Sequence, residues 1–135
     1  MLTKVTRLPL IVSLLLALMA TVAARAAGAQ QANASLVSRA VAFVRTLAQG
    51  EFQTAEADFT EQMKQGLPPQ RLAAVWQQVL SQAGPFQDTG NSTTAVQAGY
   101  TIVVVRADFK SRALGIEVAF DPERKIAGVH FVAPP

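Results

Sequence analysis

Apolar residues between positions 36 and 83 recur every three or four positions, which is the spacing of helices with one buried face. The first stretch comprises Leu36, Val37, Ala40, Val41, Phe43, Val44 and Leu47. It ends before Gly50, a usual helix stop. A second helix is predicted over 51–64, with its apolar stripe at Phe52, Ala55, Phe59 and Met63. A third is predicted from 67 to 83, because proline is tolerated in a first helical turn and Gly84-Pro85 ends the helix.

From Phe86 onward the apolar residues alternate or are β-branched, which indicates strands. Strands are predicted over 93–97, 100–109, 112–121 and 125–132, and 88–92 is predicted to be a turn or an irregular strand. The sequence therefore predicts an α+β fold in which three N-terminal helices pack on a curved antiparallel sheet of about four strands.

A register for this sheet follows if Lys110-Ser111 is a hairpin loop. One face then carries Val103, Val105 and Ala107 opposite Val118, Ile116 and Leu114, and Ala127, Val129 and Phe131 extend it. This face is almost wholly apolar. We expect the helices to cover it, each large buried side chain contributing about 1.5 to 3 kcal/mol.

The opposite, outer face of the predicted sheet is mixed in character. It carries Ile102, Val104, Arg106, Asp108, Gly115, Glu117, Ala119, Ile126, Gly128, His130 and Val132. A solvated sheet would use fewer aliphatic residues, and a second core would use fewer charged ones. This pattern favours a partly covered surface such as a homodimer interface.

The N-terminal segment, 1–29, has the features of a cleavable secretory signal. Lys4 and Arg7 precede the apolar stretch 8–22, which is too short for a spanning helix. The small residues that follow predict cleavage after Ala26 or Ala29, with an uncleaved anchor as the alternative. A short tether, 30–34, then leads into a single domain over 35–133. We expect an exported protein, periplasmic or secreted, without a stable membrane anchor.

The net charge of +3 belongs to this N-terminal segment. Removing Lys4, Arg7 and Arg25 reduces the twelve basic residues to nine, against nine acidic ones. A nucleic-acid partner is therefore not expected. The chain has no cysteine, which excludes disulfides, thiolate catalysis and a cysteine-linked lipid anchor.

The single histidine, His130, is the side chain whose ordinary pKa lies nearest neutrality. The predicted register places it on the outer face, diagonally near Glu117 and Arg106. A proton-transfer trio is one interpretation, and an interfacial or solvated salt-bridge cluster is the favoured one. One histidine with one carboxylate is too small a set for a metal site, so neither a metal nor another cofactor is expected.

Four further residues are candidates for lining a cavity between helices and sheet: Trp76, Tyr100, Thr101 and Arg112. A buried aromatic residue with one hydrogen-bond partner is the ordinary structural role for such positions. Asp58 and Glu61 are expected on a solvated helix face. No catalytic residue is assigned.

Particular residues resemble an uncharacterised bacterial domain family that is often placed before an α/β-hydrolase domain. They are Phe43-Val44, Gly50-Glu51-Phe52, Ala55, Phe59, Leu67-Pro68-Pro69, Leu72, Trp76, Gly84-Pro85-Phe86, Tyr100 and the run 125–131. The resemblance covers about 35–133 and implies a cone-shaped fold like that of nuclear transport factor 2 and the ketosteroid isomerases. No hydrolase domain or Gly-x-Ser-x-Gly motif is present in this chain, and the family's matching residues are packing and turn residues.

The function that these observations favour is non-covalent binding of a small apolar molecule in the helix-sheet cavity, or of a protein through the outer face. An accessory role in trans with an α/β-hydrolase is the first alternative. An isomerase is the second, and it would need an acid or base inside the cavity.

Overall fold

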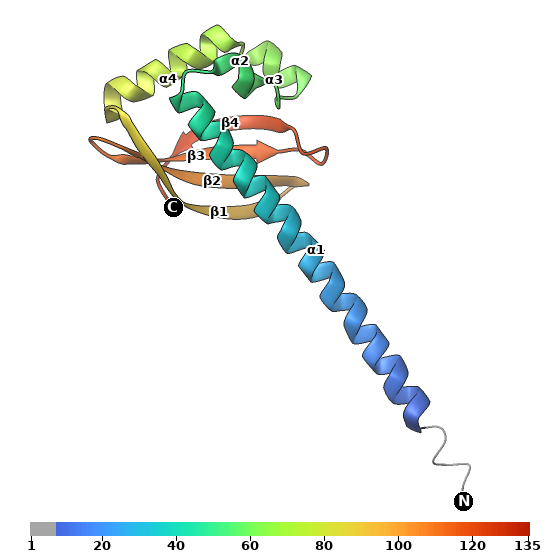
Figure 1. Ribbon diagram of the computed structural model, residues 1–135. Helices are drawn as coiled ribbons and strands as arrows, with labels where there is room; N and C mark the ends of the chain where they lie inside the picture. The colour runs from blue at the N-terminus through green and yellow to red at the C-terminus, as the bar shows by residue number, and fades with distance from the viewer. Residues whose placement is uncertain (1–7) are drawn as a thin grey trace, which may run out of the picture. The chain divides into compact units, whose positions relative to one another are not determined.

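In the described part of the chain, four helices and four strands make up an α+β structure. The computed structural model describes residues 8–135, and of 8–26 the backbone alone. The elements are α1 (Leu8–Ala48), α2 (Phe52–Glu56), α3 (Glu61–Gly66), α4 (Pro69–Ala83), β1 (Phe86–Gln97), β2 (Tyr100–Phe109), β3 (Ala113–Phe120) and β4 (Ile126–Val132) (Figure 1). Contacts divide the chain into two units, Met1–Ala34 and Ser35–Pro135.

The first unit contains the N-terminal part of α1. The predicted signal residues Lys4 and Arg7 lie outside the described residues. The segment 30–34, expected to be a tether, is helical, and no helix start occurs there. The physical reason is that residues 29–49 contain no glycine or proline, so the helix has no breaker before Gly50. In the part of the chain that the structure describes, no helix is long and apolar enough to cross a membrane.

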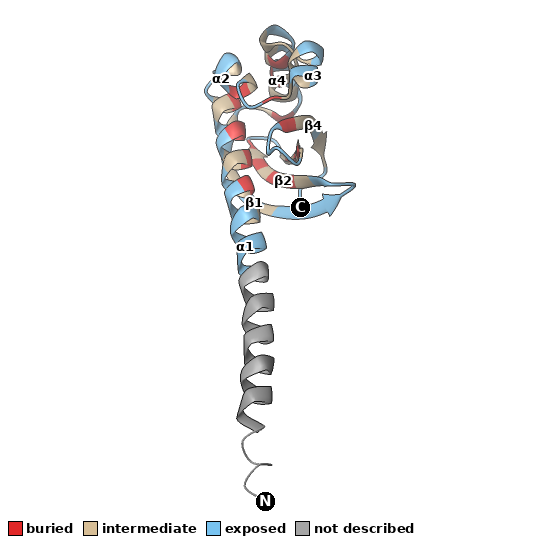
Figure 2. Cartoon of the chain, turned by 90° about the vertical axis from the view of Figure 1, so that its right-hand side faces the viewer, coloured by how far each residue is buried: buried red, intermediate tan, exposed pale blue. Residues whose placement is uncertain are grey.

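The second unit is an open antiparallel sheet in the order β1-β2-β3-β4, with helices packed against one face. Buried residues gather between the helices and this inner face (Figure 2). From the helices they are Leu36, Ala40, Phe43, Val44, Leu47, Ala55, Leu72, Trp76 and Ala83. From the sheet they are Val103, Val105, Ala107, Phe109, Ile116, Val118, Phe120 and Ile126. The interior that the sequence predicted between helices and sheet is thus filled with apolar side chains.

The predicted pairing of β2 with β3 is confirmed. Val103 lies opposite Val118, Val105 opposite Ile116 and Ala107 opposite Leu114. On β4 the predicted faces are correct for Val129 and Phe131, which pack against the core, and wrong for Ile126. A register shift at Ala119/Phe120 places Ile126 opposite Phe120, and Ile126 is buried. Ile126 therefore belongs to the inner face, and Ala127 is the extra residue of this bulge, which exchanges the faces of the two side chains.

The predicted single helix over 51–64 is wrong. It is two short helices, α2 and α3, separated by an extended segment around Phe59. Phe59 forms a parallel bridge with Ile126: the Thr60 amide donates to the Ile126 carbonyl at 3.0 Å, and the Ile126 amide donates to the Asp58 carbonyl at 2.8 Å. The Thr60 hydroxyl then caps α3 by accepting from the Met63 amide at 3.1 Å. Pairing with β4 and this cap replace the helical hydrogen bonds that the break removes.

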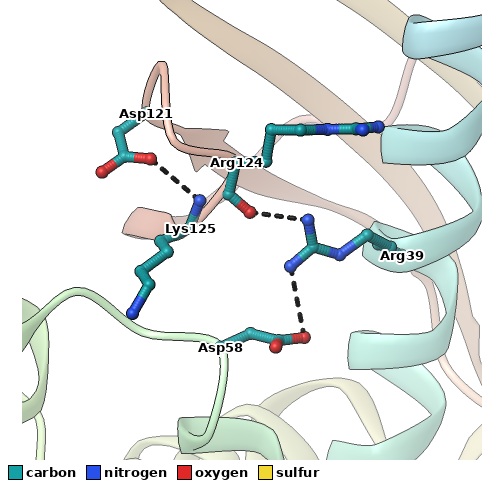
Figure 3. Close-up of polar contacts among 5 residues, drawn as sticks. All are labelled: Arg39, Asp58, Asp121, Arg124 and Lys125. Atoms are coloured by element: carbon teal, nitrogen blue, oxygen red, sulfur yellow. Dashed lines mark hydrogen bonds and ion pairs between the residues drawn. The ribbon is translucent and has the colours of Figure 1, made fainter.

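Arg39 joins α1 to the loop before β4 and to the α2–α3 segment (Figure 3). Its guanidinium donates to the Arg124 carbonyl at 2.6 Å and lies 3.5 Å from an Asp58 carboxylate oxygen. It also lies 5.5 Å from the centre of the Phe120 ring. Arg124 adopts a φ of 65°, and the adjacent turn is closed by the Lys125 amide donating to Asp121 at 2.8 Å. Arg39 thus holds together three segments that are distant in the sequence.

We expect Arg39→Ala to lower the free energy of unfolding by about 1 to 2 kcal/mol, because it removes a charge-assisted hydrogen bond and a cation–π contact. Arg39→Lys should recover part of this loss. Chemical denaturation followed by circular dichroism measures both. The matched control is Arg71→Ala, since Arg71 donates only to the nearby Gly66 carbonyl at 3.2 Å and is exposed. Equal losses for Arg39→Ala and Arg71→Ala would contradict the role given to Arg39.

Candidate functional site

The outer face of the sheet carries a hollow of about 700 Å³ that reaches from the β1–β2 hairpin to α3. Its apolar lining includes Met63, Ile102, Ala119 and Ala127, and its polar lining includes Thr60, Gln62, Gln97, Asp121 and His130. Tyr100, Ala98, Gly66 and Gly128 complete it. We call it the outer hollow. Its lining combines apolar residues with several polar ones, which is the usual composition of a small-molecule site.

Tyr100 reaches the outer hollow because of the turn that precedes it. Ala98 and Gly99 have φ values of 51° and 83°, the two left-handed positions of a type I′ hairpin turn. The turn pairs Gln97 with Tyr100 at the ends of β1 and β2. Tyr100 is 42% exposed, and its ring forms part of the wall of the hollow. The sequence-based candidate Tyr100 is therefore an accessible aromatic residue at a cavity, although on the outer face of the sheet.

His130 stands at the margin of the outer hollow and pairs with Glu117. The two residues are direct cross-strand partners, not diagonal ones, and His130 Nδ1 lies 3.6 Å from Glu117 Oε1. The histidine side chain is 69% exposed and that of Glu117 is 29% exposed. Because both side chains are exposed to solvent, the two residues form a surface ion pair when His130 is protonated.

Arg106 does not complete a trio with these two residues. Its Nε lies 2.9 Å from the Asp108 carboxylate, two positions along the same strand. Its side chain also passes over Gly90 of β1, where a Cβ would lie 2.8 Å from the Arg106 Cδ. Gly90 therefore provides the space in which Arg106 lies flat on the sheet. The predicted cluster of Arg106, Glu117 and His130 is two separate ion pairs.

Trp76 is a core residue in the structure. Its side chain is 2% exposed and packs against Phe86 and Phe109, with ring centres 6.2 and 5.7 Å away. These three rings join α4 to the sheet, because Phe86 and Phe109 also pack edge to face at 5.7 Å. This arrangement is the ordinary structural role of a buried aromatic residue.

The side chains of Arg112 and Thr101 do not join Tyr100 at the outer hollow: Arg112 lies at the other end of the sheet, and Thr101, which follows Tyr100 in β2, points to the opposite face. Arg112 follows β2 at the far end of the sheet, about 30 Å from Tyr100 for a strand of this length. It lines a second hollow of about 480 Å³, the α4 groove, formed with Val75, Gln78, Val79, Gln82, Leu114, Phe131, Val132 and Ala133. Thr101 is half-buried on the inner face, opposite Val96 and Phe120. The structure therefore does not bring the four cavity candidates together.

The acidic pair on the predicted second helix is solvated. Asp58 is 60% exposed beside Arg39, and Glu61 is 82% exposed and 3.5 Å from Lys64. Among the residues whose burial the structure describes, every buried one is apolar. Over the same part of the chain, no group of three or more histidine, cysteine, aspartate or glutamate residues is placed to hold a metal ion.

The contribution of α3 to the outer hollow was not predicted from the sequence. Gln62 and Met63 line it because α3 begins anew at Thr60 and contacts β4. The signal was present in the sequence, since a threonine followed by a glutamate is a common start of a helix. The apolar stripe that includes Met63 instead indicated a continuous helix with that side chain in the core.

The outer hollow lies almost entirely within the part of the chain that matches a known family. A family model described as "Protein of unknown function (DUF3887)" matches residues 40–129. The chain belongs to the DUF3887 family. This match confirms the predicted membership of an uncharacterised family, and it extends from the C-terminal part of α1 into β4. Within the DUF3887 region lie all the lining residues of the outer hollow except His130. No curated protein and no solved structure matches the chain.

Proposed function

We propose that residues 35–135 form a non-catalytic binding module that takes a small, mostly apolar molecule in the outer hollow. The observation that carries this proposal is the contrast between the two faces of the sheet. The inner face is filled by buried apolar side chains, whereas the outer face has an open hollow of about 700 Å³ with an exposed tyrosine in its wall. A ligand placed there needs no rearrangement of the core.

The location differs from the one expected from sequence, which was the space between helices and sheet. Phe59, Phe120 and Leu47 are among the largest fully buried side chains of that space. Opening it to a ligand would separate groups whose burial stabilises the fold by about 1.5 to 3 kcal/mol each. The outer hollow offers apolar contact at Ile102, Ala119 and Met63 without this cost.

Binding is favoured over isomerase chemistry by the surroundings of the titratable groups. An isomerase of the ketosteroid type uses a carboxyl or other acid in an apolar site, where burial changes its pKa. His130 and Glu117 form a pair accessible to solvent, and Tyr100 is exposed. Tyr100 and His130, which line the hollow, are suited to hydrogen bonding with a ligand there.

The proposal includes export. The charge and apolar pattern of 1–29 supports a secretory signal cleaved near Ala26 or Ala29, with a periplasmic or secreted product. N-terminal sequencing of the protein from the exported fraction of its host should begin at Ala27 or Gln30. A sequence beginning at Met1 would contradict cleavage.

The proposal also includes a cone-shaped arrangement like that of nuclear transport factor 2. Helices on one face of a four-stranded antiparallel sheet support it. Action in trans with an α/β-hydrolase remains a prediction from the family resemblance.

A neutral apolar dye, N-phenyl-1-naphthylamine, tests the ligand site. Ala119→Phe places a ring on the floor of the outer hollow without adding charge, so we expect it to raise the dissociation constant of the dye at least tenfold in a fluorescence titration. Tyr100→Ala should weaken binding about threefold or more because it removes an aromatic contact from the wall.

The matched control is Gln82→Phe, which adds the same ring at an exposed position of the α4 groove. It should leave the dissociation constant within about twofold of wild type. If Gln82→Phe weakens dye binding and Ala119→Phe does not, the ligand site is the α4 groove. Binding that neither variant changes would contradict both surface sites.

A further inference from the structure

The second half of β1, at one edge of the sheet, is regularly paired with β2 and exposed. Among the residues that the structure describes, β1 has β2 as its single neighbour in the sheet, and no strand pairs with its other edge. Register shifts at Phe86/Asp88 and Thr89/Ser92 disturb the first half of the strand, whereas Thr93–Gln97 pairs with β2 without interruption. Every residue from Thr93 to Gln97 is exposed, and Val96 is 71% exposed. Regular extended backbone with a free edge is a template for another strand.

The opposite edge of the sheet, at β4, is partly covered by another segment of the chain. The beginning of β4 is covered by the α2–α3 segment, through the bridge between Phe59 and Ile126 and the two backbone hydrogen bonds that flank it. α3 also packs against β4. At its beginning the β4 edge is therefore occupied by another segment, whereas every residue of the second half of β1 is exposed.

Features that usually prevent strands from pairing are absent from the second half of β1. No proline and no charged residue occurs from Thr89 to Gly99. Edge strands of soluble proteins commonly carry lysine, proline or an inward-pointing charge for this purpose. An uncharged strand can meet a second copy of itself without repulsion between like charges.

The hairpin turn determines which amides face the free edge. In a two-residue hairpin the residues that flank the turn, here Gln97 and Tyr100, exchange hydrogen bonds. Strand alternation then directs the amides of Ala95 and Thr93 toward β2, and those of Val96 and Thr94 toward the free edge. The available donors and acceptors thus belong to Thr94 and Val96.

We propose that this edge binds the β1 edge of a second copy of the chain, antiparallel and centred on Ala95, so that one sheet runs through both copies. A twofold axis at Ala95 places Val96 opposite the partner's Thr94 in both directions, and about four backbone hydrogen bonds form. The same alignment covers the exposed Val96 side chain with the partner's Thr94. The occupant is a second copy because the segment is complementary to itself in backbone pattern and carries no charge.

A disulfide test exploits the absence of cysteine from the wild-type chain. In the proposed alignment the two Ala95 residues face each other as a non-hydrogen-bonded pair, which places their Cβ atoms within reach of a disulfide. With oxidised glutathione as oxidant, Ala95→Cys should form a covalent dimer at least ten times faster than Thr93→Cys. The two positions share a strand, a face and an exposed environment. In the proposed dimer, however, the two Thr93 residues lie roughly 13 Å apart, beyond disulfide range.

Sedimentation velocity of the protein purified from its host tests the non-covalent dimer. Val96→Pro removes an edge amide and leaves the β1–β2 hydrogen bonds in place, so the dimer dissociation constant should rise at least tenfold. Val96→Lys keeps the amide and adds a charge at an exposed position, and it should weaken the dimer as well. Circular dichroism confirms that each variant is folded.

The control is Val104→Lys on the outer face, which should leave the edge dimer intact. Dissociation by Val104→Lys with no effect of the Val96 variants would overturn the edge proposal in favour of the outer-face dimer expected from sequence. The edge proposal would also be overturned if the two cysteine variants crosslinked at equal rates. A wild-type protein that is monomeric at 0.5 mM, or that associates only with a different polypeptide, would overturn it as well. Dye binding in the outer hollow is measured separately, so failure of the dimer and failure of the ligand site are distinguishable.

Discussion

Replacing Trp76 by alanine is expected to lower the free energy of unfolding by about 3 to 5 kcal/mol. Trp76 is 2% exposed and packs against both Phe86 and Phe109, so truncation leaves a cavity where α4 meets the sheet. A domain of about 100 residues has a free energy of unfolding of roughly 5 to 15 kcal/mol, and the variant would retain a fraction of this stability. Far-UV circular dichroism during urea denaturation measures the change, because Trp76 is the only tryptophan and the variant has no indole fluorescence.

Two further variants separate packing from other effects at this position. Trp76→Phe keeps an aromatic ring and should recover more than half of the loss. Gln77→Ala changes the adjacent, exposed position of the same helix and should shift the free energy by less than about 0.5 kcal/mol. A loss for Trp76→Ala as small as that for Gln77→Ala would show that Trp76 lies outside the core.

Phe59→Ala is the second substitution with a large expected effect, again about 3 to 5 kcal/mol. Phe59 is fully buried, its ring centre lies 5.8 Å from that of Phe43, and its backbone forms the bridge to Ile126. Truncation removes the side chain that holds the α2–α3 segment against the core. Hydrogen exchange should therefore show faster exchange of the Thr60 and Ile126 amides, in addition to the lower global stability.

Asp58→Ala is the matched control for this segment. Asp58 is the preceding residue, its side chain is 60% exposed, and its ion pair with Arg39 is 3.5 Å long. A surface pair of this kind contributes about 0 to 1 kcal/mol. If Asp58→Ala and Phe59→Ala were equally destabilising, the ion pair and not ring burial would hold the segment in place.

In this member of the DUF3887 family, the way in which two copies associate affects access to the outer hollow. The outer hollow and the β1 edge are adjacent through the hairpin, since Gln97, the last residue of β1, and Ala98, in the turn, both line the hollow. A dimer formed along β1 leaves the outer face open, whereas a dimer formed through the outer face would cover the hollow. The oligomeric arrangement therefore decides whether a ligand can reach Tyr100.

The sequence by itself determined the α+β class, the helix before Gly84-Pro85 and the pairing of β2 with β3. β2 runs from Tyr100 to Phe109 as predicted, and its partners on β3 are those that the alternation indicated. These features were accessible because alternation along a strand and a short loop are local, and a shift of one residue would move every apolar side chain to the wrong face.

The candidate site was less accessible from sequence. Tyr100 and His130 were identified as candidates, but the outer hollow that both line also needs α3 and the bulge at Ala127. Trp76 and Phe59 both belong to apolar patterns with helical spacing. Trp76 does lie on a helix, α4, but only the fold shows that Phe59 lies in an extended bridge.

Tertiary structure alone decided where the helix over 51–64 breaks, which face Ile126 occupies and which sheet edge is free. Each depends on contacts between segments distant in the chain, such as Phe59 with Ile126 and Arg39 with Arg124. The periodicity of apolar residues predicts which side chains share a buried face of a helix or strand, but not what covers that face. The partner against which it packs is selected by the free energy of the whole core, which can override a local preference for helix.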